Sequence, residues 1–257
     1  MALAWARTRA GAGVQRIDAD PRTGSARIGG QIARIGAIDW DVPTRGTVIG
    51  TLLNTRSALD ALADAMGDNP YDRPPQAPVL YIKPANTWSA CNDEVAIPGG
   101  IEAVDIGATL GVVMGASASR AVPQNAHDLI AGYTIAIDWS EPHAKFVEPA
   151  VRQRCRDGFC SLGPWVMARD EVSMPDALSI AVFVNGMLRS THSTAECLRP
   201  VADLIADISA FMTLNEGDVL LTGTAWPLSQ ARCGDRVRVA IDGVGALENL
   251  LVAEARA

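Results

Sequence analysis

The feature that most constrains the fold is a series of short apolar runs, each closed by turn residues, that begins near Val79. The runs are VLYI, TLGVVMG, YTIAID, WVMA, SIAVFVNG, DVLLTGT and DRVRVAIDGVGALENLLV. Short runs rich in β-branched residues and bounded by Gly, Asn or Asp are typical of strands. Helical segments do not alternate with them, so a doubly wound parallel sheet is not favoured. The pattern predicts an α+β protein built around a curled mixed sheet.

Only two segments have helical spacing. The segment Ser57–Met66 carries Leu and Ala at helical intervals behind Ser57, which is a suitable N-cap, and we expect a short amphipathic helix there. The segment Arg199–Met212 predicts a second helix with one buried apolar face. That face would consist of Val201, Leu204, Ile205, Ile208 and Phe211.

The N-terminal part of the chain has a different residue pattern. Residues 1–47 alternate apolar pairs with Gly, Arg and Asp, which indicates small strands and turns. A Pro-rich stretch with Pro70, Pro74, Pro75 and Pro78 cannot continue a helix and predicts an extended link. We therefore expect a small N-terminal subdomain and linker over residues 1–75 and a main domain over residues 76–257.

Charge and cysteine content exclude several classes of protein. The formal net charge is −7, from 22 basic and 29 acidic residues, which argues against nucleic acid and anionic membrane surfaces as partners. An anion-binding site must therefore be local and built from a few arginines. The five cysteines are odd in number and lack CxxC spacing, and no apolar run reaches membrane-spanning length. The N-terminus lacks the continuous apolar region of a signal peptide, and we expect a cytoplasmic location.

Most catalytic templates do not occur in this sequence. It has no GxSxG elbow, no HExxH, no Walker loop and no dinucleotide-binding glycine pattern. Three histidines are too few for a His-rich metal site. His127 is best explained as a loop or cap residue. His143 follows Pro142 in a polar loop just past a predicted strand, where active sites are common, so it is a candidate.

The densest group of functional side chains follows the predicted strand YTIAID. That strand ends with Asp138, and a polar loop and an Arg-rich segment come next. These segments carry Glu141, His143, Glu148, Arg152, Arg154, Arg156 and Asp157. A structural explanation stays open, since Arg156 and Asp157 could pair with loop carboxylates and only pin the loop.

At these residues the sequence resembles the fumarylacetoacetate hydrolase family, and within it the isomerase/decarboxylases of 4-hydroxyphenylacetate degradation. The resemblance covers residues 48–252 through seven collinear blocks. They are GTVIGTLLNTRSALDAL, YIKPANTW, VDIGATLGVVMG, AGYTIAIDWSEPH, RQRCRDGFCSLGPW, LRPVADLIADISAFMTLNEGDVLLTGT and GDRVRVAIDGVGALEN. It implies a mixed β-sandwich roll with a small N-terminal domain, a dimer or higher oligomer, and 2-oxo-acid chemistry at Mg²⁺ or Mn²⁺.

The resemblance also implies that the metal site is degenerate. Metal-using members carry two glutamates one residue apart on the strand that here reads VDIGATLG, followed by a later aspartate. Gly107 and Thr109 stand at the glutamate positions, and Asp138 matches the aspartate. Mg²⁺ requires anionic oxygen ligands, so we expect no metal cofactor for this chain alone. In this respect the chain resembles the N-terminal, metal-less half or subunit of the bifunctional enzyme.

The resemblance assigns roles to the remaining polar positions. Arg154 aligns with a lysine that contacts substrate, and Thr224 aligns with a threonine that grips a carboxylate. Arg56 and Lys83 are expected to hold a second carboxylate, although an exposed surface lysine and a turn threonine are alternatives for Lys83 and Thr224. The catalytic candidates are Asp138, His143 and Arg154.

The chain departs from the family pattern at three further positions. Asn54-Thr55-Arg56 lacks the usual histidine, Pro142 replaces an arginine, and Ile137 replaces an asparagine. With these losses, the residues for binding are better preserved than those for catalysis. Arg154 likewise keeps the charge of the lysine but cannot act as a base.

Three functions are therefore open. The first is an isomerase/decarboxylase acting on unsaturated 2-oxo dicarboxylic acids, of the 2-hydroxyhepta-2,4-diene-1,7-dioate isomerase and 5-oxopent-3-ene-1,2,5-tricarboxylate decarboxylase type. The second is a non-catalytic or regulatory subunit, and the third is a metal-independent catalyst with a different substrate. The expected partners are a small carboxylate and either a second copy of the chain or a homologous subunit that retains the metal ligands.

Overall fold

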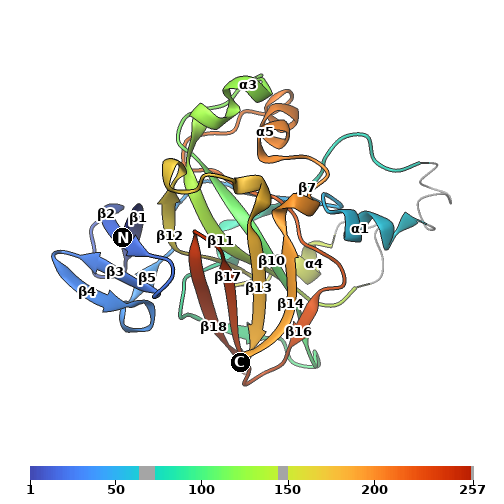
Figure 1. Cartoon of the computed structure of the whole chain (residues 1–257). Coiled ribbons are helices and arrows are strands. Elements are labelled where there is room, and N and C mark those ends of the chain that lie inside the picture. Colours follow the sequence, from blue (N-terminus) through green and yellow to red (C-terminus); the bar gives the residue numbers. More distant parts are fainter. Residues whose placement is uncertain (64–72, 144–149, 256–257) are drawn as a thin grey trace.

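The computed structural model describes residues 1–63, 73–143 and 150–255, and Figure 1 shows a strand-rich molecule with short helices at its periphery. The larger sheet has 13 strands among these residues. They are β1 (Ala2–Thr8), β2 (Gln15–Asp20), β3 (Ser25–Ile28), β4 (Gln31–Arg34), β5 (Trp40–Asp41), β6 (Val48–Leu52), β7 (Val79–Lys83), β8 (Trp88–Ser89), β10 (Val104–Met114), β11 (Ile130–Ser140), β12 (Cys160–Ala168), β15 (Val219–Leu221) and β16 (Ser229–Ala231).

The second sheet has five strands. They are β9 (Glu94–Ile97), β13 (Ser179–Val184), β14 (Met187–Ser193), β17 (Arg236–Ile241) and β18 (Gly245–Ala253). The described α-helices are α1 (Arg56–Asp60), α3 (Pro123–Ala126), α4 (Val151–Arg154) and α5 (Val201–Ser209). Short 3₁₀ turns cover Ile35–Ala37, Ala85–Thr87, His127–Leu129, Arg169–Glu171, Pro175–Ala177 and Thr194–Glu196.

Both sheets are mixed, as the sequence predicts. The main path of the larger sheet runs β4-β3-β2-β1-β12-β11-β10-β15-β6-β7. Most neighbours are antiparallel, but β15 pairs with β6, β12 with β8 and β18 with β9 in parallel. The path does not close on itself, so the described strands form an open sheet rather than a closed barrel.

The centre of the molecule lies where β10, β11 and β12 pack against the second sheet. These three strands contact β13, β17 and β18, and their residues are buried along almost the whole length. Strands covered on both faces read as near-continuous apolar runs, which explains why VDIGATLGVVM and YTIAID lack polar alternation. Trp165 fixes the contact, because its ring packs edge-on against Trp40 and its Nε1 donates to the carbonyl of Val244 at 2.7 Å.

Helix α5 is shorter than predicted. Helix α5 buries Val201, Leu204, Ile205 and Ile208 as expected, but it ends at Ser209. The expectation that Phe211 belongs to the buried face is wrong, because Phe211 follows the helix end and is 69% exposed. Helix α1 covers Arg56–Asp60, and its N-cap is Thr55 rather than Ser57. The predicted continuation of this helix toward Met66 lies partly outside the described residues, as does Pro70.

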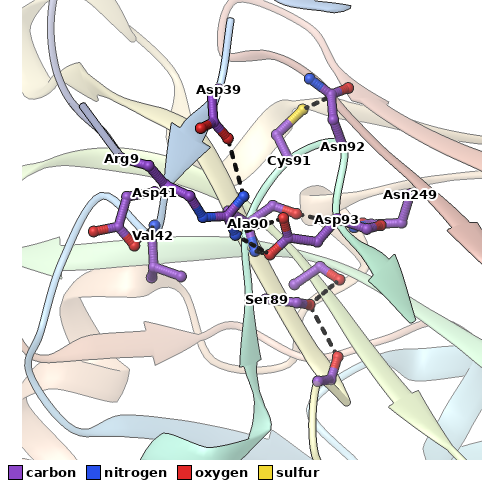
Figure 2. Close-up of polar contacts among 12 residues, drawn as sticks. Arg9, Asp39, Asp41, Val42, Ser89, Ala90, Cys91, Asn92, Asp93 and Asn249 are labelled. Carbon is purple, nitrogen blue, oxygen red and sulfur yellow. Dashed lines mark hydrogen bonds and ion pairs between the residues drawn. The ribbon is translucent and has the colours of Figure 1, made fainter. Parts of the chain in front are cut away.

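The N-terminal strands extend the larger sheet through the pairing of β1 with β12. A polar network drawn in Figure 2 adds a second connection. Arg9 donates to Asp39 at 3.0 Å and reaches both oxygens of Asp93, at 2.7 and 2.9 Å, in the loop after β8. Asn249 of β18 holds the same loop by donating to the carbonyls of Ala90 and Asp93. The division of the chain at residue 75 stays a prediction.

None of the helices in the described residues is long and apolar enough to cross a lipid bilayer.

Candidate active site

The candidate site forms around the end of β11, on the side of the larger sheet that carries β7, α1 and α4 in Figure 1. Asp138 lies opposite Gly107 of β10 and opposite Cys160 of β12. A side-chain carbon placed on Gly107 would lie 3.2 Å from Cγ2 of Thr224. Asp138, Gly107 and Thr224 therefore lie together at this end of the sheet.

Asp138 is almost fully buried, with 2% exposure, and three side chains contact its carboxylate. Lys83 Nζ lies 2.6 Å from Oδ1, and Arg154 Nη1 lies 2.6 Å from Oδ2. The hydroxyl of Tyr81 donates to Oδ2 at 2.5 Å. Two of the predicted site residues, Lys83 and Arg154, thus meet the predicted aspartate in one cluster.

Lys83 is enclosed by oxygen atoms. Its ammonium donates to the backbone carbonyls of Trp139, Arg154 and Phe159 at 3.1, 2.5 and 2.8 Å. An ammonium has three N–H bonds, and the carbonyls engage all of them, so the contact with Asp138 is mainly an ion pair. Lys83 is 1% exposed, so the alternative of an exposed surface lysine is wrong.

The cluster fixes the protonation states of its members. Burial raises the pKa of Asp138, but the charges of Lys83 and Arg154 and the hydrogen bonds outweigh it, so the pKa lies below its usual value. Burial and the charge of Asp138 raise the pKa of Tyr81 well above 10. At neutral pH the carboxylate is ionised and the phenol keeps its proton.

The loop after β11 carries a separate ion pair. Arg156 donates to Glu141, as the structural explanation of this loop predicts, whereas Asp157 accepts a hydrogen bond from Asn86 at 2.7 Å. His143 is partly exposed, and its Nδ1 lies 2.9 Å from the carbonyl of Glu141. Glu148, which the sequence adds to this group, lies outside the described residues.

The donor set does not fit a divalent cation. Gly107 supplies no ligand, and a side-chain carbon there would lie 2.5 Å from the carbonyl oxygen of Asp138. Thr109 Oγ1 is buried and accepts a bond from the Gly223 amide at 3.2 Å. The remaining carboxylate is already neutralised by an ammonium and a guanidinium. No group of three or more metal-ligating side chains that could hold an ion occurs among the described residues.

Of the predicted carboxylate handles, Thr224 lies beside the cluster, close to Gly107. Thr55 Oγ1 donates to the carbonyl of Thr224 at 2.7 Å, and this bond fixes the start of α1 next to Thr224. Asn54 strengthens the connection by donating to the carbonyl of Thr222 at 2.8 Å. Arg56 is exposed at the first position of α1 and makes no ion pair within the described part of the chain. The roles of Arg56, Lys83 and Thr224 in substrate binding stay predictions.

Two polar residues of the site were not predicted from the sequence. Tyr81 precedes Lys83 by two positions and therefore faces the same side of β7. Asp105 precedes Gly107 by two positions, accepts a bond from Gln230 at 2.9 Å, and has a pKa raised by burial. The period of two along a strand was the available signal in both cases.

Comparison with known proteins gives a consistent result. The family model described as the fumarylacetoacetate (FAA) hydrolase C-terminal region matches residues 47–252. The 4-hydroxyphenylacetate degradation bifunctional isomerase/decarboxylase of Escherichia coli is 40% identical over 210 residues, which cover 82% of this chain and 48% of that protein. The chain therefore spans about half the length of the curated relatives it matches.

Two solved structures share the fold. The 2-hydroxyhepta-2,4-diene-1,7-dioate isomerase of Mycobacterium marinum has a TM-score of 0.80 and 25% identity, and the match covers 100% of both chains. A maleylpyruvate hydrolase of Sphingobium sp. SYK-6, in complex with manganese and pyruvate, has a TM-score of 0.77 and 21% identity and covers 98% of this chain and 100% of that one. The second likeness concerns the fold alone.

Proposed function

The chain belongs to the fumarylacetoacetate hydrolase family, and on that premise we propose that it is an isomerase/decarboxylase-type enzyme for unsaturated 2-oxo dicarboxylic acids that works without a divalent ion. The observation that carries the proposal is the cluster at Asp138, in which Lys83 and Arg154 occupy both sides of one carboxylate. Two positive charges face one negative charge, so the cluster favours an incoming carboxylate.

In this proposal each residue has a defined task. The guanidinium of Arg154 binds the 2-oxo carboxylate through a planar pair of donors, and Thr224 adds a hydroxyl. Arg56, exposed at the start of α1, binds the far carboxylate. Lys83 keeps Asp138 ionised through its charge. It does not contact the substrate, because its protons are already engaged by carbonyl oxygens. Asp138 and His143 are the groups available to accept and donate protons.

The lack of suitable metal ligands among the described residues limits the expected rate. In metal-using relatives a divalent cation would stabilise the enolate that forms when a 2-oxo acid loses CO₂ or a proton. Here the corresponding stabilisation must come from hydrogen-bond donors and the charge of Arg154. A single preorganised donor contributes about 3 to 4 kcal/mol in enzymes of known mechanism, so we expect slow tautomerisation more readily than decarboxylation.

A non-catalytic role is the second candidate, and the length comparison favours it. The match covers only 48% of the Escherichia coli isomerase/decarboxylase. A second copy of the chain, or a homologous subunit with intact metal ligands, would correspond to the part of that relative outside the match. In that case the cluster would bind the carboxylate and the chain would stabilise or regulate its partner. A metal-independent catalyst with a different substrate is the third candidate, and the replacement of the usual histidine by Thr55 supports it.

The experiment uses the purified chain after treatment with EDTA. Its probe is 2-hydroxyhepta-2,4-diene-1,7-dioate, and loss of the conjugated diene is followed by ultraviolet absorbance. We expect turnover that added Mg²⁺ or Mn²⁺ does not change, and calorimetry should detect no stoichiometric metal uptake. Turnover that depends on Mg²⁺ would refute the metal-free proposal. Binding of the probe without turnover, together with recovery of a longer-lived complex with a metal-bearing homologue, would favour the regulatory subunit.

A matched pair of variants tests the role of Arg154. Both Arg152 and Arg154 lie in α4, but Arg152 is exposed and Arg154 contacts Asp138. Arg154→Ala should raise KM by at least about tenfold, since a charge-assisted hydrogen bond contributes about 1.5 to 3 kcal/mol. Arg152→Ala should change KM by less than about twofold. Equal effects of the two substitutions would mean that only the general charge of α4 matters.

A further inference from the structure

Tyr81 is the partly exposed neutral residue that contacts Asp138. Asp138 is 2% exposed, with Oδ1 against Lys83 and Oδ2 against Arg154 and Tyr81. Tyr81 is partly exposed, and the side chain of Arg154 is 15% exposed. Within the cluster, Tyr81 and Arg154 are therefore more accessible to a ligand than Asp138 and Lys83.

The fold makes specific room for the Tyr81 ring. Tyr81 of β7 pairs across the strands with Gly50 of β6. A side-chain carbon on Gly50 would lie 2.0 Å from Cζ of Tyr81, so the ring lies directly over bare backbone. Arg154 covers the ring from another side, with its guanidinium carbon 4.9 Å from the ring centroid. The position of the Tyr81 hydroxyl is thus set by the register of two strands and by a cation–π contact.

We propose that Tyr81 is a catalytic residue that relays the proton of the substrate's enol hydroxyl to Asp138. This inference rests on the proposed function and names the group through which Asp138 acts. The oxygen of Tyr81 accepts the enol proton while its own proton passes to Oδ2 of Asp138 along the existing hydrogen bond. The enol O–H bond breaks and its electron pair stays on the substrate as a delocalised dienolate. The keto C=O bond is completed when the C=C electron pair forms the new C–H bond.

The proton balance closes within the pair. The proton held by Asp138 returns through Tyr81 to a carbon of the substrate, where a C–H bond forms, and both side chains regain their starting states. Because the phenol oxygen gains one proton as it loses another, no tyrosinate has to form. The concerted transfer suits a phenol whose pKa is raised far above neutral pH, because a free tyrosinate would be costly. The lowered pKa of Asp138 keeps the carboxylate ionised before the transfer and makes its protonated form short-lived. Other charged groups near the relay are Lys83, Asp105 and His143.

The first test compares two tyrosine variants of the full chain. Tyr81→Phe removes the relay but keeps the ring over Gly50, so kcat for the diene probe should fall by about 100-fold or more, whereas KM should change by less than about threefold. Tyr133→Phe is the matched control, because the hydroxyl of Tyr133 is buried without a hydrogen-bond partner in the described residues. That control should retain kcat. A Tyr81→Phe variant that keeps kcat within about threefold of the unmodified chain would overturn the proposal.

The second test does not depend on activity. The sequence contains three tyrosines, so labelling with ¹³Cζ-tyrosine gives a simple spectrum, and Tyr81→Phe identifies the Tyr81 resonance. Oxalate is the probe, as a planar dianion shaped like the enolate of a 2-oxo acid. Saturation with oxalate should move the Tyr81 resonance and leave the Tyr133 resonance in place. If oxalate binds by calorimetry and the Tyr81 resonance stays fixed, the relay is refuted.

The two tests separate this inference from the proposed function. Turnover of the diene with a fixed Tyr81 resonance, or with an active Tyr81→Phe variant, rejects the relay but keeps the enzyme. Oxalate binding without any turnover by the unmodified chain rejects the enzymatic function and the relay together, even when the Tyr81 resonance moves.

Discussion

At the scale of single residues, the site depends on how Asp138 stays ionised while it is buried. A buried carboxylate is costly unless it is paired and hydrogen-bonded, and Asp138 has an ammonium, a guanidinium and a phenol within 2.6 Å. A divalent ion is one solution to this problem, and two tethered cations are another. In the structure Lys83 and Arg154 provide the two cations, and Arg154 and Tyr81 are the more exposed members of the cluster.

The first prediction concerns Asp138→Asn. This change keeps the shape of the side chain but leaves Lys83 buried without a counter-charge, so it should lower the free energy of unfolding by about 3 to 5 kcal/mol at pH 7. The folded-state pKa of Asp138 is lowered, so its stabilisation is complete above the unfolded pKa of about 3.9. It is lost as the pH falls through the folded value.

The difference in unfolding free energy between the unmodified chain and Asp138→Asn should therefore be constant from about pH 5 to 7. It should become smaller below about pH 4. Urea unfolding at several pH values measures it. Asp128→Asn is the control, because the Asp128 side chain is 80% exposed and its loss should cost less than about 0.5 kcal/mol. A difference that stays unchanged below pH 4 would contradict the ionised state assigned to Asp138.

The second prediction concerns Gly50→Ala. The added methyl group would overlap the Tyr81 ring, so the variant should lose about 1 to 3 kcal/mol of unfolding free energy and displace Tyr81 from Asp138. Gly99→Ala is the control, because Gly99 has nothing within 4 Å of the added carbon. Chemical denaturation measures the stability, and the ¹³Cζ resonance of Tyr81 reports the displacement. Equal stabilities of the two variants would show that the ring can move at no cost.

Sequence patterns predicted Asp138, Lys83 and Arg154 individually but not the form of their contact. The alternation of a strand places Tyr81 and Lys83 on one face, yet which face meets Asp138 depends on the pairing of β6 with β7 and of β10 with β11. These pairings join segments far apart in the sequence. Asp105 was missed for the same reason, since its burial beside Gln230 of β16 follows from a long-range pairing.

At the scale of elements, strands were predicted well because their signals are local. Each of the seven apolar runs contains a strand, and the mixed character of the sheet is confirmed. Helix ends were predicted less well. Phe211 continues the apolar spacing of α5, but the chain turns after Ser209 and the ring is exposed. Periodicity identifies a face but does not determine where the backbone leaves the helix.

Helix α1 gives the third prediction. Its cap, Thr55, donates to the carbonyl of Thr224 and accepts from the amide of Ala58. Thr55→Ala loses both bonds and should cost about 1 to 2 kcal/mol of stability. It should also weaken oxalate binding, because the segment that carries Thr224 loses its hydrogen bond to the start of α1. Thr55→Ser keeps the hydroxyl and should restore most of both losses, as measured by denaturation and calorimetry. A Thr55→Ser variant as weak as Thr55→Ala would rule out the hydroxyl as the cause.

At the scale of the whole molecule, the site lies in the larger sheet, and the N-terminal strands join that sheet at its far side from β7. Pairing of β1 with β12 continues the sheet, and the network around Arg9 fastens the N-terminal turns to the loop after β8 (Figure 2). The family match begins at residue 47, so β1 to β5 lie outside it. No sequence motif predicted the Arg9 network, because its partners, Asp39 and Asp93, are distant in the chain.

The last prediction tests whether the N-terminal strands β1 to β5 unfold locally, without unfolding of the site. The side chain of Arg9 is 50% exposed, so its ion pairs are screened by solvent and Arg9→Ala should change the global unfolding free energy by less than about 1 kcal/mol. The free energy of local unfolding of β1–β5 should fall by more than the global value, because this region loses its ion pair with Asp93. Hydrogen exchange should therefore accelerate in β2 to β5 and stay unchanged in β10 and β11. Arg16→Ala, at an exposed position of β2, is the control and should leave both regions as they are. Faster exchange in β10 and β11 would mean that the N-terminal strands and the site open as one cooperative unit.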